Sequence, residues 1–213
     1  MHSHSHAHHG HAHGPIPLEG APPGYRRVLW IALAVNAAMF LLEIGGGLRS
    51  GSVSLLADAI DFLGDAANYG LSLAVLSMGA VARARAAMVK AVSMLVFGAA
   101  VLGRAGWAVI SGAPPEPITM GVVGLLALLS NVGVGMLLYA YREGDANMRS
   151  VWLCTRNDAI GNIAVLAAAL GVLGTGTRWP DLAVAAVMGG LALSAGISVT
   201  RQVRQELAHA KRA

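Results

Sequence analysis

Long apolar stretches dominate the chain, and short segments with glycine, proline or charged residues separate them. Six such stretches follow one another, at about 28–48, 53–78, 88–112, 118–141, 150–173 and 181–200. Each is about as long as the roughly 20 apolar residues that a membrane-spanning helix needs. The pattern therefore predicts an all-α membrane protein with six transmembrane helices and no second folded domain.

The basic residues between these stretches predict the orientation, because Lys and Arg gather on the cytoplasmic side of a membrane. Only Arg49 and Arg178 fall on one side of the predicted bundle. The basic residues on the other side are Arg26, Arg27, Arg83, Arg85, Lys90, Arg142, Arg149, Arg201, Arg204, Lys211 and Arg212. Both termini are therefore expected in the cytoplasm. Residues 26–204 form the expected transmembrane domain, and 205–213 form a short cytoplasmic C-terminal tail.

The composition supports the membrane and excludes other classes. Of the 213 residues, 55% are hydrophobic and 12% are charged, against about 25% charged in soluble domains. A water-soluble globular enzyme is therefore excluded. The net charge is +4, but the basic residues lie between apolar stretches and form no single patch, so no nucleic-acid partner is expected. One cysteine excludes an intramolecular disulfide framework.

The N-terminal residues 1–25 are expected to be a disordered cytoplasmic tail that is rich in histidine. Seven of the eight histidines stand here: His2, His4, His6, His8, His9, His11 and His13. Imidazole groups bind Zn, Cu, Ni and Co ions. We expect the tail to bind metal, and whether transport requires the tail stays open.

Five acidic residues fall inside the apolar stretches, namely Glu43, Asp58, Asp61, Asp65 and Asp158. A carboxylate in the bilayer costs several kcal/mol unless it is paired, protonated or facing water, so it marks a functional site by default. Glu43 and Asp58 stand nearer the ends of their stretches. For these two, an ordinary polar contact between helices or a position that faces water is an equal alternative.

The spacing of the other acids predicts a metal site. Asp61 and Asp65 are four residues apart, as are Cys154 and Asp158, so each pair shares one face of its helix. Together they offer four ligands, the number that a tetrahedral divalent metal takes. Like charges on one stripe repel, and an arriving cation relieves that repulsion. The alternative for Cys154 is a small buried hydrophobic side chain.

Two blocks resemble the cation diffusion facilitator family, the six-helix exporters of zinc and related divalent metals. They are VNAAMFLLEIGGGLRSGSVSLLADAIDFLGDAAN (35–68) and NMRSVWLCTRNDAIGNIAVL (147–166), and the resemblance extends from 28 to about 204. It implies that Asp61, Asp65 and Asp158 hold the transported ion. Cys154 stands where the family has histidine. Because thiolate favours softer ions and carboxylate harder ones, the preferred metal is open.

The resemblance also implies accessory polar residues and a shortened chain. Asn36 and Glu43 on the first helix, and Asn131 on the fourth, stand at positions where the family carries polar residues. Only 201–213 follow the sixth helix, so we expect a short member without the cytoplasmic C-terminal domain. A homodimer would then form through transmembrane helices. The expected location is the bacterial inner (plasma) membrane.

The expected function is secondary transport that exports divalent metal cations from the cytoplasm in exchange for protons. Zn²⁺ is the expected substrate, with Cd, Co, Ni and Fe ions as alternatives. No prosthetic group and no enzymatic activity are expected. One alternative is a membrane protein that binds metal without transporting it. The other is an intramembrane aspartyl hydrolase, for which Gly64 and Asp65 supply only half of the usual Gly-x-Gly-Asp phrase.

Two internal cations, Arg104 and Arg156, have no assigned role. Arg156 stands two residues before Asp158 and so points to a different helix face. It would pair with Asp58 or another carboxylate, or reach toward the cytoplasm. A tight pair with the metal site would compete with the metal.

Overall fold

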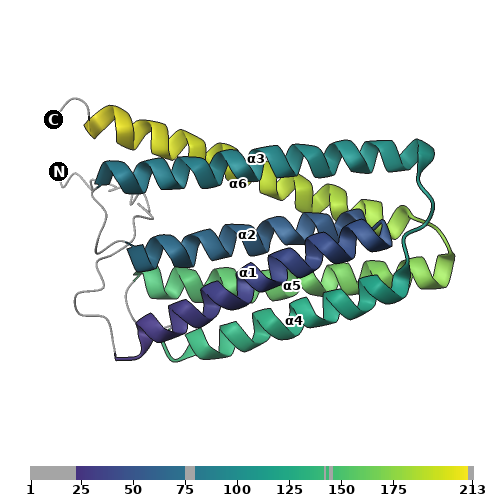
Figure 1. Cartoon of the computed structure of the whole chain (residues 1–213), viewed down its shortest axis with the longest axis horizontal. Helices are drawn as coiled ribbons and strands as arrows, with labels where there is room; N and C mark the ends of the chain where they lie inside the picture. Colours follow the sequence, from purple (N-terminus) through teal and green to yellow (C-terminus); the bar gives the residue numbers. More distant parts are fainter. Residues whose placement is uncertain (1–22, 75–79, 142, 144–145, 211–213) are drawn as a thin grey trace, which may run out of the picture.

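The computed structural model describes residues 23–74, 80–141, 143 and 146–210, which form six helices (Figure 1). The helices are α1 (Tyr25–Ser50), α2 (Val53–Ala74), α3 (Ala80–Ser111), α4 (Pro117–Tyr139), α5 (Ala146–Thr175) and α6 (Trp179–Ala210). The described part of the chain contains no strand. The expectation of an all-α fold with six helices is confirmed. The seven histidines of the predicted tail lie outside the described residues.

The helices alternate in direction along the bundle (Figure 1). Helices α1, α3 and α5 run one way, and α2, α4 and α6 run the other. The start of α1 and the end of α6 therefore lie at the same end of the bundle. That agrees with an even number of membrane crossings. That this end of the bundle faces the cytoplasm stays a prediction.

Helix α2 is the central element, because it packs against each of the other five helices. Its first half is buried on every side, from Val53 to Ile60. The other five helices are long and apolar enough to cross a membrane, whereas α2 carries three aspartates. A helix that is shielded from lipid by its neighbours is the one place where such charges are tolerated.

Helices α3 and α6 are longer than the apolar stretches predicted. Each has 32 residues, which corresponds to about 48 Å, against about 30 Å for the hydrocarbon core of a bilayer. The predicted stretches began at 88 and ended at 200, whereas the helices begin at Ala80 and end at Ala210. Hydropathy falls where charged residues begin, but Ala, Arg and Glu are good helix formers, so the helix continues.

Helices α3 and α6 pair closely through glycines. A Cβ atom on Gly189 would lie 2.9 Å from Leu102, and one on Gly196 would lie 2.9 Å from Leu95. Such contacts are closer than real Cβ atoms make, so a side chain at either position would force the facing leucine to move. Small residues at helix contacts are the usual solution where lipid gives no hydrophobic drive for association.

The turn from α1 into α2 uses two glycines for different reasons. A Cβ atom on Gly47 would lie 2.8 Å from the Leu56 side chain, so Gly47 is a packing position. Gly51 ends α1 with φ +77°, a left-handed conformation that disfavours any other residue. Of these two glycines, only Gly47 is therefore a packing position.

A carboxylate from another helix caps the start of α2. Asp181, in the first turn of α6, is 1% exposed. It accepts hydrogen bonds from Ser52 Oγ (2.7 Å), Val53 N (2.8 Å), Ser54 N (3.0 Å) and Ser54 Oγ (2.6 Å). The first N–H groups of a helix have no partner within it, and an acceptor there stabilises the helix. Asp181 therefore attaches the start of α2 to α6.

Candidate metal site

The middle of α2 faces α5 through carboxyl groups. Asp61 and Asp65 lie eight and twelve residues after Val53, and both are half-buried, as is Asp158 on α5. The carboxyl groups of Asp65 and Asp158 lie within hydrogen-bonding reach of each other. Asp61 is near enough for its charge to act on both. The fold thus brings two distant segments together where the spacing placed a metal site.

The remaining predicted ligand, Cys154, belongs to α5, one helical turn before Asp158. Its side chain lies outside the described residues. Among the described side chains, no three of His, Cys, Asp and Glu come close enough to surround one ion. The set of Asp61, Asp65, Cys154 and Asp158 therefore stays a prediction.

Few hydrogen-bond donors reach these carboxyl groups. The Tyr69 hydroxyl, one turn along α2, bonds to Asp65 and also lies 2.9 Å from Thr155 Oγ1 on α5. One oxygen of Asp158, Oδ2, is buried without a partner among the described residues. Two facing carboxyl groups repel when both are ionised, so they need a proton or a cation between them. The arrangement is therefore suited to exchanging a proton for a metal cation.

A second polar group lies beside this site, and we call it the Asp58 relay. It is fully buried and crosses α4, α5, α2 and α1. Asn131 Nδ2 donates to Asn162 Oδ1 (2.9 Å), and Asn162 Nδ2 donates to Asp58 Oδ2 (2.7 Å). A carboxylate can only accept hydrogen bonds. Asp58 therefore fixes the orientation of the Asn162 side-chain amide, and through it that of the Asn131 amide.

Glu43 ends the Asp58 relay on α1. Its carboxyl group lies beside that of Asp58, and its side chain is 0% exposed. Neither Glu43 oxygen has a hydrogen-bond partner among the described residues. The two carboxyl groups can bond only when one of them carries a proton. Glu43 and Asp58 are therefore neighbours of the candidate site, and neither is a surface residue facing water.

The other predicted polar residues do not join the site. Asn36 lies on the buried face of α1, and its Nδ2 donates to Ala32 O (2.8 Å) in its own helix. The guanidinium of Arg156 lies 5.5 Å from the centre of the Trp152 ring and donates to Asn157 Oδ1 (3.4 Å). The Arg156 side chain is exposed, so it does not compete with a metal. Arg104 is exposed as well.

The structure adds residues that sequence reasoning did not single out. Asn162 stands four residues after Asp158 and Tyr69 four after Asp65, so helical spacing could have found both. Lys90 was grouped with the cytoplasmic basic residues. In the structure its Nζ donates to Asn68 Oδ1 on α2, and its charge acts on Asp65. No local spacing reveals that contact, because it depends on how α3 packs against α2.

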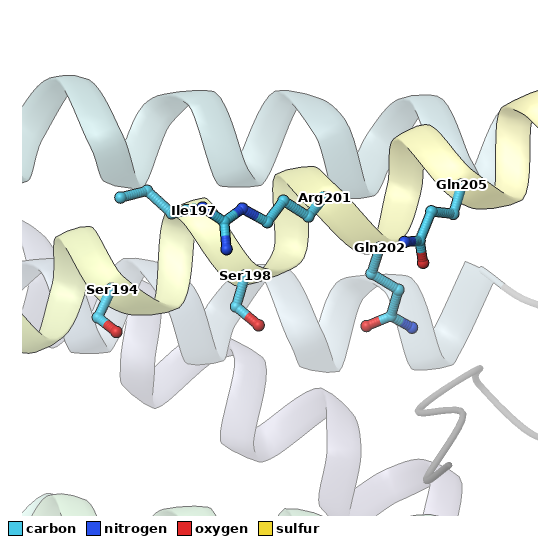
Figure 2. Close-up of a pocket in the computed structure, with 6 residues that line it drawn as sticks. All are labelled: Ser194, Ile197, Ser198, Arg201, Gln202 and Gln205. Atoms are coloured by element: carbon cyan, nitrogen blue, oxygen red, sulfur yellow. The ribbon is translucent and has the colours of Figure 1, made fainter.

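A groove on α6 lies apart from these residues. Figure 2 shows its lining side chains along one stretch of the helix: Ser194, Ile197, Ser198, Arg201, Gln202 and Gln205. None of the five acidic residues contributes to it. All of its lining residues belong to a single helix, and only one of them carries a charge. The groove is therefore no alternative to the site between α2 and α5.

A family model and several known proteins match this chain. The family model described as the cation efflux transmembrane domain matches residues 29–208. The metal cation efflux system protein CzcD of Cupriavidus metallidurans is 28% identical over 180 residues, 79% of this chain and 57% of that protein. The zinc transporter ZitB of Escherichia coli is 30% identical over 166 residues, 71% of this chain and 52% of that protein.

A third relative is the cadmium, cobalt and zinc/H(+)-K(+) antiporter of Bacillus velezensis, 26% identical over 193 residues. That match covers 83% of this chain and 61% of the antiporter, so the chain spans about half the length of the curated relatives it matches. The names of these relatives describe transporters and not enzymes, and the family model together with the five apolar helices of the described residues indicates a multi-pass membrane protein. On the match over 29–208, the chain belongs to the cation efflux family of transmembrane proteins, the cation diffusion facilitators.

Proposed function

We propose that this chain exports divalent metal cations from the cytoplasm in exchange for protons. Asp61, Asp65, Cys154 and Asp158 hold the ion. The observation that carries the proposal is the meeting of Asp65 on α2 with Asp158 on α5 in the middle of the bundle. Intramembrane carboxylates of this kind mark ion pathways and proton relays.

The donor set supports Zn²⁺ as substrate. Zinc accepts carboxylate oxygen and thiolate sulfur in tetrahedral sites, whereas Mg²⁺ and Ca²⁺ take oxygen only. Relatives are named a zinc transporter and a cadmium, cobalt and zinc antiporter. Cysteine at 154 shifts the preference toward softer ions, so Cd²⁺ is the expected competitor.

Proton exchange follows from the same carboxyl groups. Without metal, Asp65 and Asp158 face each other and are held together by a shared proton. A divalent ion displaces that proton and a second one from another of the four ligands when the site opens to the cytoplasm, and two protons replace the ion when the site opens outside. Two protons per divalent ion make the exchange electrically neutral, so it uses the pH gradient alone. Otherwise each net positive charge would release about 2.3 kcal/mol per 100 mV when it moves inward, and would cost as much when it moves outward.

The test is Zn²⁺ uptake into inside-out vesicles with an imposed pH gradient. We expect uptake that collapses when the gradient is removed. Asp158→Ala should reduce uptake by about 100-fold, because one ligand and one proton carrier are lost together. Glu116→Gln is the matched control, since Glu116 is an exposed carboxylate at the start of α4. It should transport like the unaltered protein.

Three results would contradict the proposal. Full uptake by the Asp158→Ala variant would remove the site assignment. Tight Zn²⁺ binding without any flux would instead identify a metal-binding protein that does not transport. Peptide cleavage without any metal dependence would support the alternative of an intramembrane aspartyl hydrolase.

We also propose that the histidine tail collects metal at the cytoplasmic opening and that two copies associate through transmembrane helices.

A further inference from the structure

Two exposed tryptophans and two exposed arginines mark the edges of the bilayer on the paired helices α3 and α6. Trp107 on α3 and Trp179 on α6 are 66% and 60% exposed. Arg85 on α3 and Arg201 on α6 are exposed as well, and each lies 22 residues from the tryptophan of its own helix. That separation corresponds to about 33 Å along a helix, close to the roughly 30 Å of the hydrocarbon core. Both residue types are typical of membrane boundaries, so Arg201 lies at the level of lipid headgroups.

The two arginines lie at the same boundary, because α3 and α6 run in opposite directions (Figure 1). The close approach of Gly196 to Leu95 shows which parts of the two helices are paired. The boundary with the arginines is at the end of the bundle where α1 begins and α6 ends. Arg104 is exposed too, but it lies one turn from Trp107 and therefore at the opposite boundary.

The Arg201 side chain lines the groove on α6, which has a volume of about 390 Å³. Figure 2 shows this side chain extending along the helix toward Ile197 and Ser198, away from Gln205. Ile197 and Ser198 lie nearer the middle of the span, so the guanidinium is turned toward the hydrocarbon and away from water. Arg201 forms no ion pair or hydrogen bond with the described residues.

A guanidinium in this place is suited to an anion that belongs to the membrane. A charge near hydrocarbon costs several kcal/mol unless it is paired, and guanidinium binds phosphate through two parallel hydrogen bonds. The side chains of Ser198 and Gln205 offer further donors in the same groove. Ile197 is 44% exposed and offers apolar surface on the hydrocarbon side. An acyl chain would cover that surface, whereas a free phosphate ion would not.

We propose that the groove on α6 binds the phosphate group of an anionic phospholipid from the leaflet on the side of Arg201. The guanidinium and the neighbouring donors hold the phosphate, and the acyl chains lie along Ile197 toward the middle of the bilayer. A zwitterionic lipid also carries a phosphate, but its ammonium group cancels the charge that attracts Arg201. The inference does not depend on the transport function.

Native mass spectrometry of the purified protein in detergent measures the binding of single lipid molecules. The probes are phosphatidylglycerol and phosphatidylcholine with identical acyl chains. The unaltered protein should bind the first phosphatidylglycerol at least about tenfold more tightly than phosphatidylcholine. Arg201→Gln should reduce this preference to about twofold or less. Arg201→Lys keeps the charge but loses the paired hydrogen bonds, so its preference should be intermediate.

Arg204→Gln is the matched control, because Arg204 is exposed on the same helix but does not line the groove. It should lower the preference by about twofold at most. Ser198→Leu fills the groove without any change of charge and should weaken phosphatidylglycerol binding by about fivefold or more. These positions are exposed, so the substitutions should leave the fold intact.

Four results would overturn the proposal. Equal losses in Arg201→Gln and Arg204→Gln would show that general surface charge attracts the lipid. Unchanged binding in Ser198→Leu would show that the groove is not the site. Displacement of bound phosphatidylglycerol by inorganic phosphate would assign the groove to a free anion. A change from dimer to monomer in Arg201→Gln, with lipid binding unaltered, would make the groove a contact between two copies.

Discussion

Helix α2 meets buried acids at two places, and the protein treats them differently. At its start, the Asp181 carboxylate of α6 accepts four hydrogen bonds, two from backbone N–H groups and two from serine hydroxyls. In its middle, Asp65 faces the carboxyl group of Asp158, and one oxygen of Asp158 has no partner among the described residues. Both places are within the bundle.

The number of donors separates a structural acid from a functional one. A buried carboxylate whose acceptor capacity is filled by fixed donors contributes to stability and has no need of a cation. A carboxylate that faces another carboxylate is destabilising until a proton or metal arrives. The Asp58 relay is intermediate, because Asn162 donates to Asp58 while Glu43 receives no donor among the described residues.

The largest expected effect on stability is at Asp181. Asp181→Ala leaves the donors at the start of α2 without their acceptor and should lower the free energy of unfolding by about 4 kcal/mol. Unfolding in mixed detergent micelles measures this. Asp181→Asn keeps one acceptor oxygen and should lose about half as much. Equal stability of all three proteins would show that the capping hydrogen bonds are not important.

The next largest effect concerns the Asp58 relay. Asn162→Leu keeps the size of the side chain but removes the donor to Asp58 and the acceptor for Asn131. The free energy of unfolding should fall by about 2 kcal/mol in the same measurement. Ile163→Ala is the control, because Ile163 is an exposed neighbour on α5, and it should change stability by about 0.5 kcal/mol or less. Similar losses for both variants would contradict the relay.

A smaller effect of opposite sign is expected at the candidate site. Asp158→Asn replaces a carboxylate by an amide that donates to Asp65, so the free energy of unfolding should rise by about 1 kcal/mol. The same variant should lose Zn²⁺ uptake. Stability and transport are measured on one preparation. A loss of stability here would indicate that Asp158 is a structural acid like Asp181.

The smallest effect concerns Glu116, an exposed cap at the start of α4. Glu116 accepts hydrogen bonds from Ile118 N (2.9 Å) and Thr119 N (2.7 Å). Hydrogen bonding to Thr119, with a smaller part from Ile118, holds the pKa of Glu116 below its ordinary value of 4.5. The cap therefore stabilises α4 above that pH, and its contribution is lost as the pH falls through the lowered pKa.

An NMR titration of labelled glutamate carboxyl groups measures this pKa directly. Glu116→Gln removes the signal and so assigns it. Amide exchange at Thr119 should accelerate at the same pH. A midpoint at or above 4.5 would contradict the capping role.

Hydropathy predicted the six helices, and spacing singled out the acids of α2 and α5. The predicted start of α3 was eight residues too late and the predicted end of α6 was ten residues too early. Hydropathy reports contact with lipid, whereas a helix can continue beyond the lipid. The partners Asn162, Lys90 and Asp181 were not identified. Of these, only Asn162 shares a helix face with a predicted site residue, so only Asn162 had a local signal.

The sequence by itself determined the fold class, the number of helices and the acidic residues that stand inside apolar stretches. Each of these depends on a single residue type or on spacing within one helix. The tertiary structure decided which carboxylates have donors and which face each other. Asp181 and Asp158 are both acids on membrane helices, and no local pattern separates them. The difference arises because α6 brings Asp181 to the free N–H groups of α2, whereas α5 brings Asp158 to another carboxylate.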